Sequence, residues 1–228
     1  MIQEYEVKEI ITDPEILSDW SEVIHPKKEG KLCQQIIGEL KATMRANNLE
    51  YLTAPQIGYK KRIFCVRYGK NDYRSYINPS ISNNIGITIV REICNSIPDK
   101  RFVIPRFNKI EIMYFKPLKD SPEACIASGR TAHIMSHCVD HLDGSLTSDI
   151  GLEIDDMFDA ATDEEREEVI KMYLESLDIR TKQLQEEIQN DEELKKMNDA
   201  INFMESVRKG ETILEAVDSK EEEKNESE

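Results

Sequence analysis

Apolar residues recur every four positions in residues 31–46, KLCQQIIGELKATMRA. Leu32, Ile36, Leu40 and Met44 fall on one face of a helix, and most positions between them are polar. A stripe of this kind buries one helix face and leaves the other in water. The segment therefore predicts an amphipathic helix that lies on a sheet.

Short runs rich in β-branched and aromatic residues follow, separated by turn residues. The runs are residues 62–68 (RIFCVRY), 74–79 (RSYINP), 85–93 (IGITIVREI) and 108–115 (NKIEIMYF). Pro79, Pro98 and Pro105 have no N–H for a sheet ladder, so we expect them at strand ends or edges. These runs predict a sheet of several short strands.

Two further helices are expected. One runs from about Ile126 to His141, with Gly144 as its C-terminal stop. The other is long and charged and begins after Thr162. Its apolar residues recur at spacings of three, four and seven: Val169, Tyr173, Leu177, Leu184, Ile188, Leu194, Met197, Ile201 and Met204. Such a stripe either docks on the parent domain or pairs with another chain, so residues 163–208 are a candidate surface for a protein partner or for self-association.

Charge divides the chain unevenly. The net charge of the whole sequence is −15, of which residues 151–228 carry −16 and residues 1–150 carry +1. We expect a domain over residues 1–150, an acidic helical extension over 151–217 and a disordered acidic tail over 218–228. An extension this acidic is repelled by phosphate backbones, so no nucleic-acid partner is expected for it.

No run of about 18 apolar residues occurs. The start, MIQEYEVKEIITD, has no basic flank followed by an apolar block. We therefore expect neither a membrane span nor a signal peptide, and a cytoplasmic location. The five cysteines are an odd number without disulfide-like clustering, which fits free thiols or metal ligands. Cys33, Cys65 and Cys125 are interpreted as packing thiols.

The stretch HIMSHCVDH, residues 133–141, carries three histidines spaced four apart. Because residues four apart share a helix face, two or three imidazoles can point at one metal ion. Taken alone the spacing is a weak signal, since helical histidines are more often ordinary surface or core residues. Cys138 stands where an HExxH helix carries its catalytic glutamate.

Three ordered segments strengthen the signal. They are LEYLTAPQIG (49–58), EICNS (92–96) and HCVDH (137–141), and they resemble the motifs GxGLAAxQ, EGCLS and HExDH of the peptide deformylase family. The flanking stretches YINPSI, IPDKRFVIPR and HLDG are also similar to that family. The resemblance covers roughly residues 5–150.

The resemblance implies an α+β fold, with antiparallel strands wrapped around a central helix that carries two of the metal ligands. It further implies one divalent metal ion, Fe²⁺ or Zn²⁺, held by Cys94, His137 and His141. A thiolate and two imidazoles leave the fourth tetrahedral position open for water, as in catalytic sites.

In the reaction that the resemblance implies, water activated by the metal attacks the formyl carbon of an N-formylated peptide. Gln56 is expected to donate its side-chain amide to the developing oxyanion, together with the backbone N–H of Asn95. Asp140 resembles the family's aspartate that supports the structure around the site. Its alternative role is simple solvation on the outer side of the helix.

Cys138 departs from the family pattern. The family's glutamate moves a proton between water and the leaving amine, and three roles are open for the cysteine that replaces it. It can act as a substitute acid and base, as a fourth metal ligand that closes the site, or as a small buried residue. A cysteine at this position resembles the phage-encoded branch of the family, and the location would then be the host cytoplasm.

The substrate cleft departs as well. Leu49, Tyr51 and Ile93 stand where the family has glycines, which narrows or reshapes the cleft. The residues that resemble the family's apolar side-chain pocket are Glu50, Val90, Arg130, His133 and Ile134. We expect a Glu50–Arg130 ion pair to fill this pocket from within, and His133 to line it, with metal binding as its alternative.

Two functions remain open from the sequence. The first is a metal-dependent amide hydrolase that removes the N-formyl group from nascent polypeptides, supported by the ligand set and Gln56. The second is a catalytically impaired protein of the same fold that serves as a binding or assembly component, for example in a phage particle, through its acidic extension.

Overall fold

The computed structural model describes residues 5–190. The chain divides into two compact units, residues 1–161 and residues 162–228. The predicted tail at 218–228 and the apolar positions from Leu194 to Met204 lie outside the described residues. Among those described, no helix is long and apolar enough to cross a membrane.

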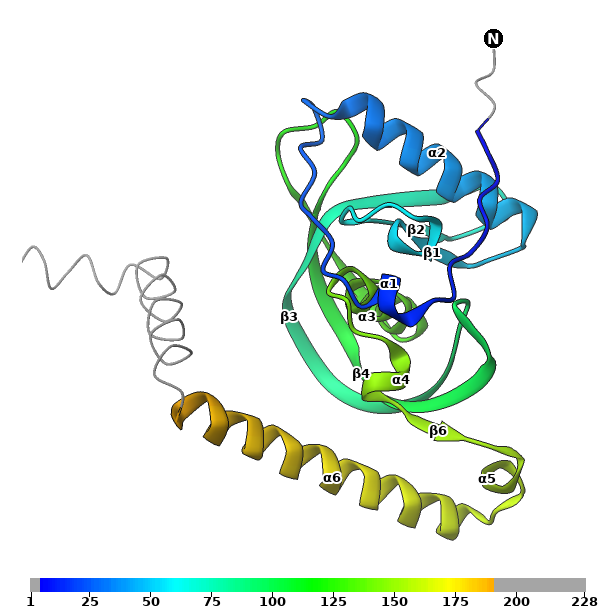
Figure 1. Cartoon of the computed structure of the whole chain (residues 1–228), viewed down its shortest axis with the longest axis vertical. Coiled ribbons are helices and arrows are strands. Elements are labelled where there is room, and N and C mark those ends of the chain that lie inside the picture. The colour runs from blue at the N-terminus through cyan, green and yellow to red at the C-terminus, as the bar shows by residue number, and fades with distance from the viewer. Residues whose placement is uncertain (1–4, 191–228) are drawn as a thin grey trace, which may run out of the picture. The chain divides into compact units, whose positions relative to one another are not determined.

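The first unit is built on a six-stranded antiparallel sheet, with strand order β1-β2-β3-β4-β5 and with β6 pairing on β4 (Figure 1). The strands are β1 (Tyr51–Thr53), β2 (Ile63–Arg67), β3 (Tyr73–Cys94), β4 (Ile97–Phe115), β5 (Glu123–Ser128) and β6 (Leu152–Ile154). The helices are α1 (Pro14–Leu17), α2 (Gly30–Ala46), the 3-10 turn η1 (Pro55–Ile57), α3 (Arg130–Leu142), α4 (Thr147–Ile150) and α5 (Asp156–Ala160). Helices and an antiparallel sheet in one unit confirm the α+β class.

Alternation along β2 explains how two helices share one strand. Ile63 and Cys65 pack in the cluster beneath α2, whereas Phe64 and Val66 pack in the cluster around α3. Successive side chains of a strand point to opposite faces, so β2 carries one hydrophobic cluster on each face. The predicted helix over residues 31–46 is confirmed as α2, and it lies on β1 and β2 as expected (Figure 1).

The long hairpin of β3 and β4 differs from the prediction of separate short strands. Residues 74–79 and 85–93 belong to one strand, β3, whose pairing with β4 shifts near Pro79, Ser82 and Ile93. These irregularities let a long strand bend around the core, as the curved ribbons in Figure 1 show.

Pro105 lies within β4 rather than at its end. Residues 101–103 of β4 pair with β6 and residues 109–114 pair with β5, so Pro105 falls between the two paired stretches. The strand is locally an edge there, and a residue without an N–H is tolerated for the reason expected.

The helix that carries the two histidines begins later than predicted. Residues 123–128 form β5 on the edge of β4, and the chain turns at Gly129 with φ 55° before α3 starts at Arg130. The predicted start near Ile126 is therefore wrong. Gly144 does end the helix, with φ 72°, and its N–H donates to the carbonyl of His141.

The division between the units falls after Ala161 rather than at residue 150. β6 pairs with β4, and α5 is tied to the hairpin by ion pairs from Arg91 and Arg101 to Asp159. These elements therefore belong with the first unit, not with the extension.

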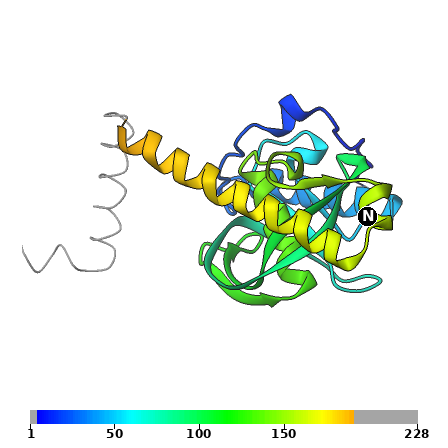
Figure 2. The same ribbon diagram turned by 90° about the horizontal axis from the view of Figure 1, so that it is seen from below.

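The second unit begins with α6 (Asp163–Asn190), a single long helix shown in yellow and orange in Figure 2. The Thr162 hydroxyl accepts from the Glu165 N–H at 3.3 Å, and a Glu165 carboxylate oxygen accepts from the Thr162 N–H at 2.8 Å. This reciprocal capping box fixes where the helix starts. The helix predicted after Thr162 is confirmed over these residues.

Candidate metal centre

Three buried side chains meet between the end of β3 and the middle of α3. Cys94 is the last residue of β3, and His137 and His141 lie one turn apart on α3. Their ligand atoms all lie within 4.8 Å of one another, with Cys94 Sγ 3.1 Å from His141 Nε2. The residues expected as ligands, more than forty positions apart in the chain, are thus brought together.

The electrostatics of this cluster favour a thiolate. Burial raises the pKa of the Cys94 thiol, but the neighbouring imidazoles of His137 and His141 outweigh it and hold the pKa at about 5. Burial lowers the pKa of His137, but the nearby Cys94 and Glu92 outweigh it and raise the pKa to about 9. Each group therefore stabilises the charged form of the other.

The donor set fits a divalent transition metal. Among the described residues, His137 Nε2 is buried and has no hydrogen-bond partner. A buried ring nitrogen without a partner is costly unless it has a ligand to bind. One thiolate and two imidazoles at this separation suit Zn²⁺ or Fe²⁺ and leave a further coordination position open.

A shell of polar residues orients His137. Its Nδ1 lies 3.0 Å from a Glu92 carboxylate oxygen and 3.3 Å from the Thr147 hydroxyl. Glu92 accepts two hydrogen bonds from the buried Arg106, at 2.7 and 2.9 Å, and Arg106 also donates to Asp140. Burial raises the pKa of Glu92, but Arg106 and His137 outweigh it and lower the pKa to about 2. A carboxylate behind a ligating imidazole fixes the ring's orientation.

Sequence reasoning assigned no role to Glu92, Arg106 or Thr147. Glu92 opens the segment EICNS and Arg106 closes IPDKRFVIPR, both of which carry the family resemblance, so the signal was present in the motifs. Asp140 was expected to support the structure of the site, and its bond to Arg106 agrees with that role rather than with simple solvation.

Gln56 is fully buried in η1 and held from both ends. Its side-chain carbonyl accepts from the N–H and the hydroxyl of Thr53, both at 3.1 Å, and its amide donates to the Ser96 hydroxyl at 3.1 Å. Ser96 is two residues beyond Cys94, so the amide faces the segment that carries the thiol ligand. Asn95, which stands between Cys94 and Ser96 in the chain, is half-buried and lines a cleft.

Cys138 lies in the hydrophobic cluster around α3, with Phe64, Ala132 and Leu142, and is fully buried. Burial raises the pKa of its thiol well above the ordinary value. Among the described residues, the group of possible metal ligands holds Cys94, His137 and His141 without it. These observations favour the small-buried-residue interpretation over the other two.

A cleft of about 660 Å³ opens beside His137. All five residues predicted for the side-chain pocket line it, as do the three that replace glycines: Glu50, Val90, Arg130, His133, Ile134, Leu49, Tyr51 and Ile93. Such a volume is within the range of small-ligand and peptide side-chain sites.

Glu50 and Arg130 form the expected ion pair, but at the mouth of the cleft. Their side chains are 43% and 75% exposed, so the pair does not fill the pocket from within as predicted. His133 lines the cleft, and among the described residues its buried Nε2 has no hydrogen-bond partner. It is not part of the ligand cluster.

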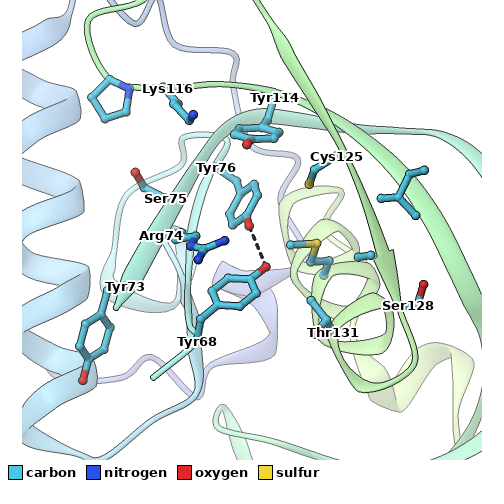
Figure 3. Close-up of a pocket in the computed structure, with 14 residues that line it drawn as sticks. Tyr68, Tyr73, Arg74, Ser75, Tyr76, Tyr114, Lys116, Cys125, Ser128 and Thr131 are labelled. Carbon is cyan, nitrogen blue, oxygen red and sulfur yellow. Dashed lines mark hydrogen bonds between the residues drawn. The ribbon is translucent and has the colours of Figure 1, made fainter. Parts of the chain in front are cut away.

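A second hollow, of about 570 Å³, lies against another side of α3 (Figure 3). Four tyrosines line it, Tyr68, Tyr73, Tyr76 and Tyr114, and the hydroxyls of Tyr68 and Tyr76 lie 2.8 Å apart. It shares no lining residue with the first cleft and reaches none of the three candidate ligands. The cleft beside His137 is therefore the one that serves the candidate metal centre.

These features define an α+β protein with a three-donor metal site at the base of a cleft, the arrangement of a catalytic rather than a structural metal. The chain belongs to the polypeptide deformylase family, whose profile matches residues 7–153. The match spans the sheet, both hydrophobic clusters and all three candidate ligands.

Individual relatives agree with this assignment. The chain is 32% identical to a peptide deformylase of Dictyoglomus turgidum over 133 residues, which are 57% of this chain and 86% of that protein. It is 35% identical to a peptide deformylase of Heliobacterium modesticaldum over 117 residues, 50% of this chain and 75% of the relative.

Solved structures show the same fold. A class I type b peptide deformylase of Acinetobacter baumannii superposes with a TM-score of 0.56 and 27% identity, covering 61% of this chain and 96% of that one. The peptide deformylase of Thermotoga maritima gives a TM-score of 0.56 and 26% identity, with 65% and 97% covered. The deformylase fold expected from the motifs is thus confirmed.

Proposed function

We propose that this protein is a metal-dependent peptide deformylase, which hydrolyses the formyl amide at the N-terminus of nascent polypeptides. The observation that carries the proposal is the cluster of Cys94, His137 and His141, buried at the base of a cleft in a chain of the deformylase family. The relatives are named peptide deformylases, which supports this reaction. The cluster of three candidate metal ligands supports the proposal that this chain has kept the activity.

Cys94, His137 and His141 would hold one divalent ion, Fe²⁺ or Zn²⁺. When bound, such an ion lowers the pKa of water to about 7 and so provides hydroxide at neutral pH. The chain's own contribution begins with the lowered pKa of Cys94, which keeps the thiol ionised and ready to bind. Glu92 holds the His137 ring so that Nε2 faces Cys94, and Arg106 keeps Glu92 ionised.

Gln56 would stabilise the negative charge that develops on the formyl oxygen. Its amide nitrogen gives one N–H to Ser96, which leaves the second for an oxyanion, and Thr53 prevents the amide from rotating. The backbone N–H of Asn95 would be the second donor. A preorganised donor of this kind contributes about 10²–10³ in kcat.

Proton transfer is the weak point of the site. Cys138 is buried among apolar side chains and its pKa is raised by burial, so it is poorly suited to exchange a proton with water. A missing general acid and base costs about 10²–10⁴ in rate. We therefore propose slow turnover, in which water itself carries the proton.

The cleft would take the first side chain of an N-formylated peptide. Val90 and Ile134 provide an apolar wall, to which Leu49 and Ile93 add, while Glu50, Arg130 and His133 contribute polar groups. A pocket of mixed polarity binds methionine less tightly than an apolar one does, because polar groups must lose water to admit it. A raised KM for formyl-methionine peptides is the expected consequence.

The test is hydrolysis of formyl-Met-Ala-Ser by protein purified without oxygen and loaded with Fe²⁺ or Ni²⁺. We expect slow turnover that depends on bound metal, with one ion per chain. Cys94→Ala should abolish metal binding, because it removes the thiolate and leaves two imidazoles. Cys125→Ala is the matched control, since Cys125 lies on β5, away from the three candidate metal ligands.

Absence of turnover from protein that binds metal one to one would contradict the enzyme proposal. It would favour a deformylase-fold protein that keeps the metal for stability and works as a binding or assembly component.

A further inference from the structure

The side chain of Tyr51 reaches across the cleft beside the candidate metal centre. Tyr51 is the first residue of β1, and its hydroxyl donates to the backbone carbonyl of Ile93 at 3.2 Å. Ile93 directly precedes the ligand Cys94 at the end of β3. Because β1 and β3 are not neighbours in the sheet, this bond links two rims of the cleft that no ladder joins.

A second bond runs in the opposite direction. The side-chain amide of Asn95 donates to the carbonyl of Tyr51 at 3.4 Å. An extended peptide that enters a cleft between strands pairs with free backbone groups along its rims. Here two such carbonyls, those of Ile93 and Tyr51, are already occupied by side chains of the same chain.

The ring of Tyr51 also covers a ligand. Its centroid lies 5.1 Å from that of His137, and the two rings meet edge to face at 68°. His137 is only 2% exposed, and Cys94 and His141 are 0% and 1% exposed. The cleft is lined by His137 but not by Cys94 or His141, so its floor stops at the first ligand.

With the ring in this position, His137 is the one candidate ligand that lines the cleft, and Cys94 and His141 are buried behind it. The Tyr51 side chain is held by one hydrogen bond to a carbonyl, by one aromatic contact and by packing against the hydrophobic cluster around α3, and rotation of the side chain would remove the first two. One hydrogen bond of this kind contributes about 1 kcal/mol. Loss of this bond alone should therefore make opening about fivefold more frequent.

We propose that Tyr51 is a gate residue that closes the metal centre and must swing away to admit either metal or substrate. What passes through the open gate, a formylated peptide, rests on the proposed function. The gating itself rests on the Tyr51 contacts alone. The bulky residue at this position is thus assigned a role in controlling access, beyond narrowing the cleft.

Metal exchange separates a gate from a residue that merely supports His137. A gate changes the rates of metal entry and release by the same factor and leaves the equilibrium affinity unchanged. A supporting residue stabilises the bound state, so its loss raises release and weakens affinity. The probe is Zn²⁺ alone, with release followed by an excess of a coloured chelator and entry followed by mixing with metal-free protein.

Tyr51→Phe keeps the ring and removes the hydroxyl bond, and we expect entry and release both to accelerate about fivefold. Tyr51→Ala removes the ring as well and should accelerate both further. Tyr59→Phe is the matched control, because the Tyr59 hydroxyl donates to Glu39 at 2.9 Å, outside the residues that line the cleft. It should leave both rates unchanged.

Unchanged rates in Tyr51→Phe and Tyr51→Ala would overturn the proposal, and so would faster release with weakened Zn²⁺ affinity. Formyl-Met-Ala-Ser hydrolysis, measured on the same proteins, keeps the two proposals apart. If no form hydrolyses the peptide while both Zn²⁺ rates rise together, the gate stands and the deformylase proposal falls. If hydrolysis occurs and the Zn²⁺ rates do not respond, the gate falls alone.

Discussion

Cys138 follows the ligand His137 directly, yet the two side chains meet different surroundings. His137 faces the thiol of Cys94, whereas Cys138 packs beside Phe64 and Leu142 in the cluster between α3 and the sheet. Successive helical residues point about 100° apart, which turns the short Cys138 thiol from the cleft into the hydrophobic cluster. A carboxylate on a longer side chain at this position would have to extend out of the cluster to meet the cleft.

Exchange at position 138 tests this directly. We expect Cys138→Ala and Cys138→Ser to keep the parent's deformylation rate within about twofold, because the thiol is not in contact with water. Cys138→Glu should raise kcat by about 10²-fold if the carboxylate reaches the cleft. Steady-state assays with formyl-Met-Ala-Ser measure both, and thermal melts report the stability cost of a buried glutamate.

A fall of tenfold or more in Cys138→Ala, in protein that still binds metal one to one, would contradict the packing interpretation. It would favour the acid-and-base role, one of the three roles that the sequence leaves open for Cys138.

Arg106 is the residue on which the polar shell depends. Its side chain is 5% exposed and bridges Glu92 and Asp140. We expect Arg106→Met to destabilise the fold by about 3–5 kcal/mol, because it leaves the Glu92 carboxylate buried without its cation. Urea denaturation measures the change. Metal affinity should fall about 10–100-fold as well, since Glu92 orients His137.

Arg101→Met is the matched control for charge. Arg101 pairs with Asp156 and Asp159, but its side chain is 39% exposed, and such pairs contribute about 0–1 kcal/mol. Equal losses of stability in Arg106→Met and Arg101→Met would mean that burial gives the Arg106–Glu92 pair no special role.

At the scale of elements, the sequence predicts the helices better than the strands. The stripe of Ile36, Leu40 and Met44 is a local pattern and locates α2 closely. β1 and β6 have three residues each, too few to show a period, and they exist because β2 and β4 offer them free edges. Local patterns cannot reveal a strand whose stability comes from a partner distant in the chain.

The same reason limits what the sequence says about the site. The motifs supply the three ligands and Gln56 because family resemblance preserves the order of residues. They do not show that Cys138 turns to the core, that Glu50 and Arg130 pair at the mouth rather than inside, or that Tyr51 bridges to Ile93. Each of these depends on how β1, β3 and α3 pack together.

Gly144 ends α3 in a place that no other residue suits. Its φ is 72°, and a Cβ there would lie 2.4 Å from the backbone oxygen of Ser18. We expect Gly144→Ala to destabilise the first unit by more than 2 kcal/mol, because strain and a backbone clash add together. The midpoint of thermal or urea unfolding measures it.

Two other glycines separate the causes. Gly129 has φ 55° and ψ −135°, a region that residues with a Cβ rarely adopt, and nothing lies within 4 Å of a Cβ, so Gly129→Ala should cost about 1–3 kcal/mol from backbone strain alone. At Gly69 no positive φ applies and the nearest atom is 3.9 Å away, so Gly69→Ala should be neutral or slightly stabilising. A different order of stability, with Gly144→Ala milder than Gly129→Ala, would refute the clash.

At the scale of the whole molecule, the two units differ in charge as well as in structure. Residues 162–228 carry a net charge of −12, whereas residues 1–161 carry −3. The family match ends at residue 153, within β6, so the acidic second unit lies outside the matched residues. The candidate ligands, Gln56 and the cleft all belong to the first unit, which should therefore bind metal on its own.

Two truncations test this and locate the boundary. A chain that ends at Ala161 keeps every strand and should fold and bind one metal ion with the affinity of the full protein. A chain that ends at Ile150 lacks β6, which pairs with residues 101–103 of β4 and carries the buried Ile154 opposite Arg101. Losing that burial should cost about 2 kcal/mol or more, because a fully buried isoleucine contributes about that much.

Thermal unfolding and Zn²⁺ titration of the two chains give the comparison. Equal stability would return the boundary to residue 150, and failure of the longer chain to fold would show that the acidic unit supports the first one.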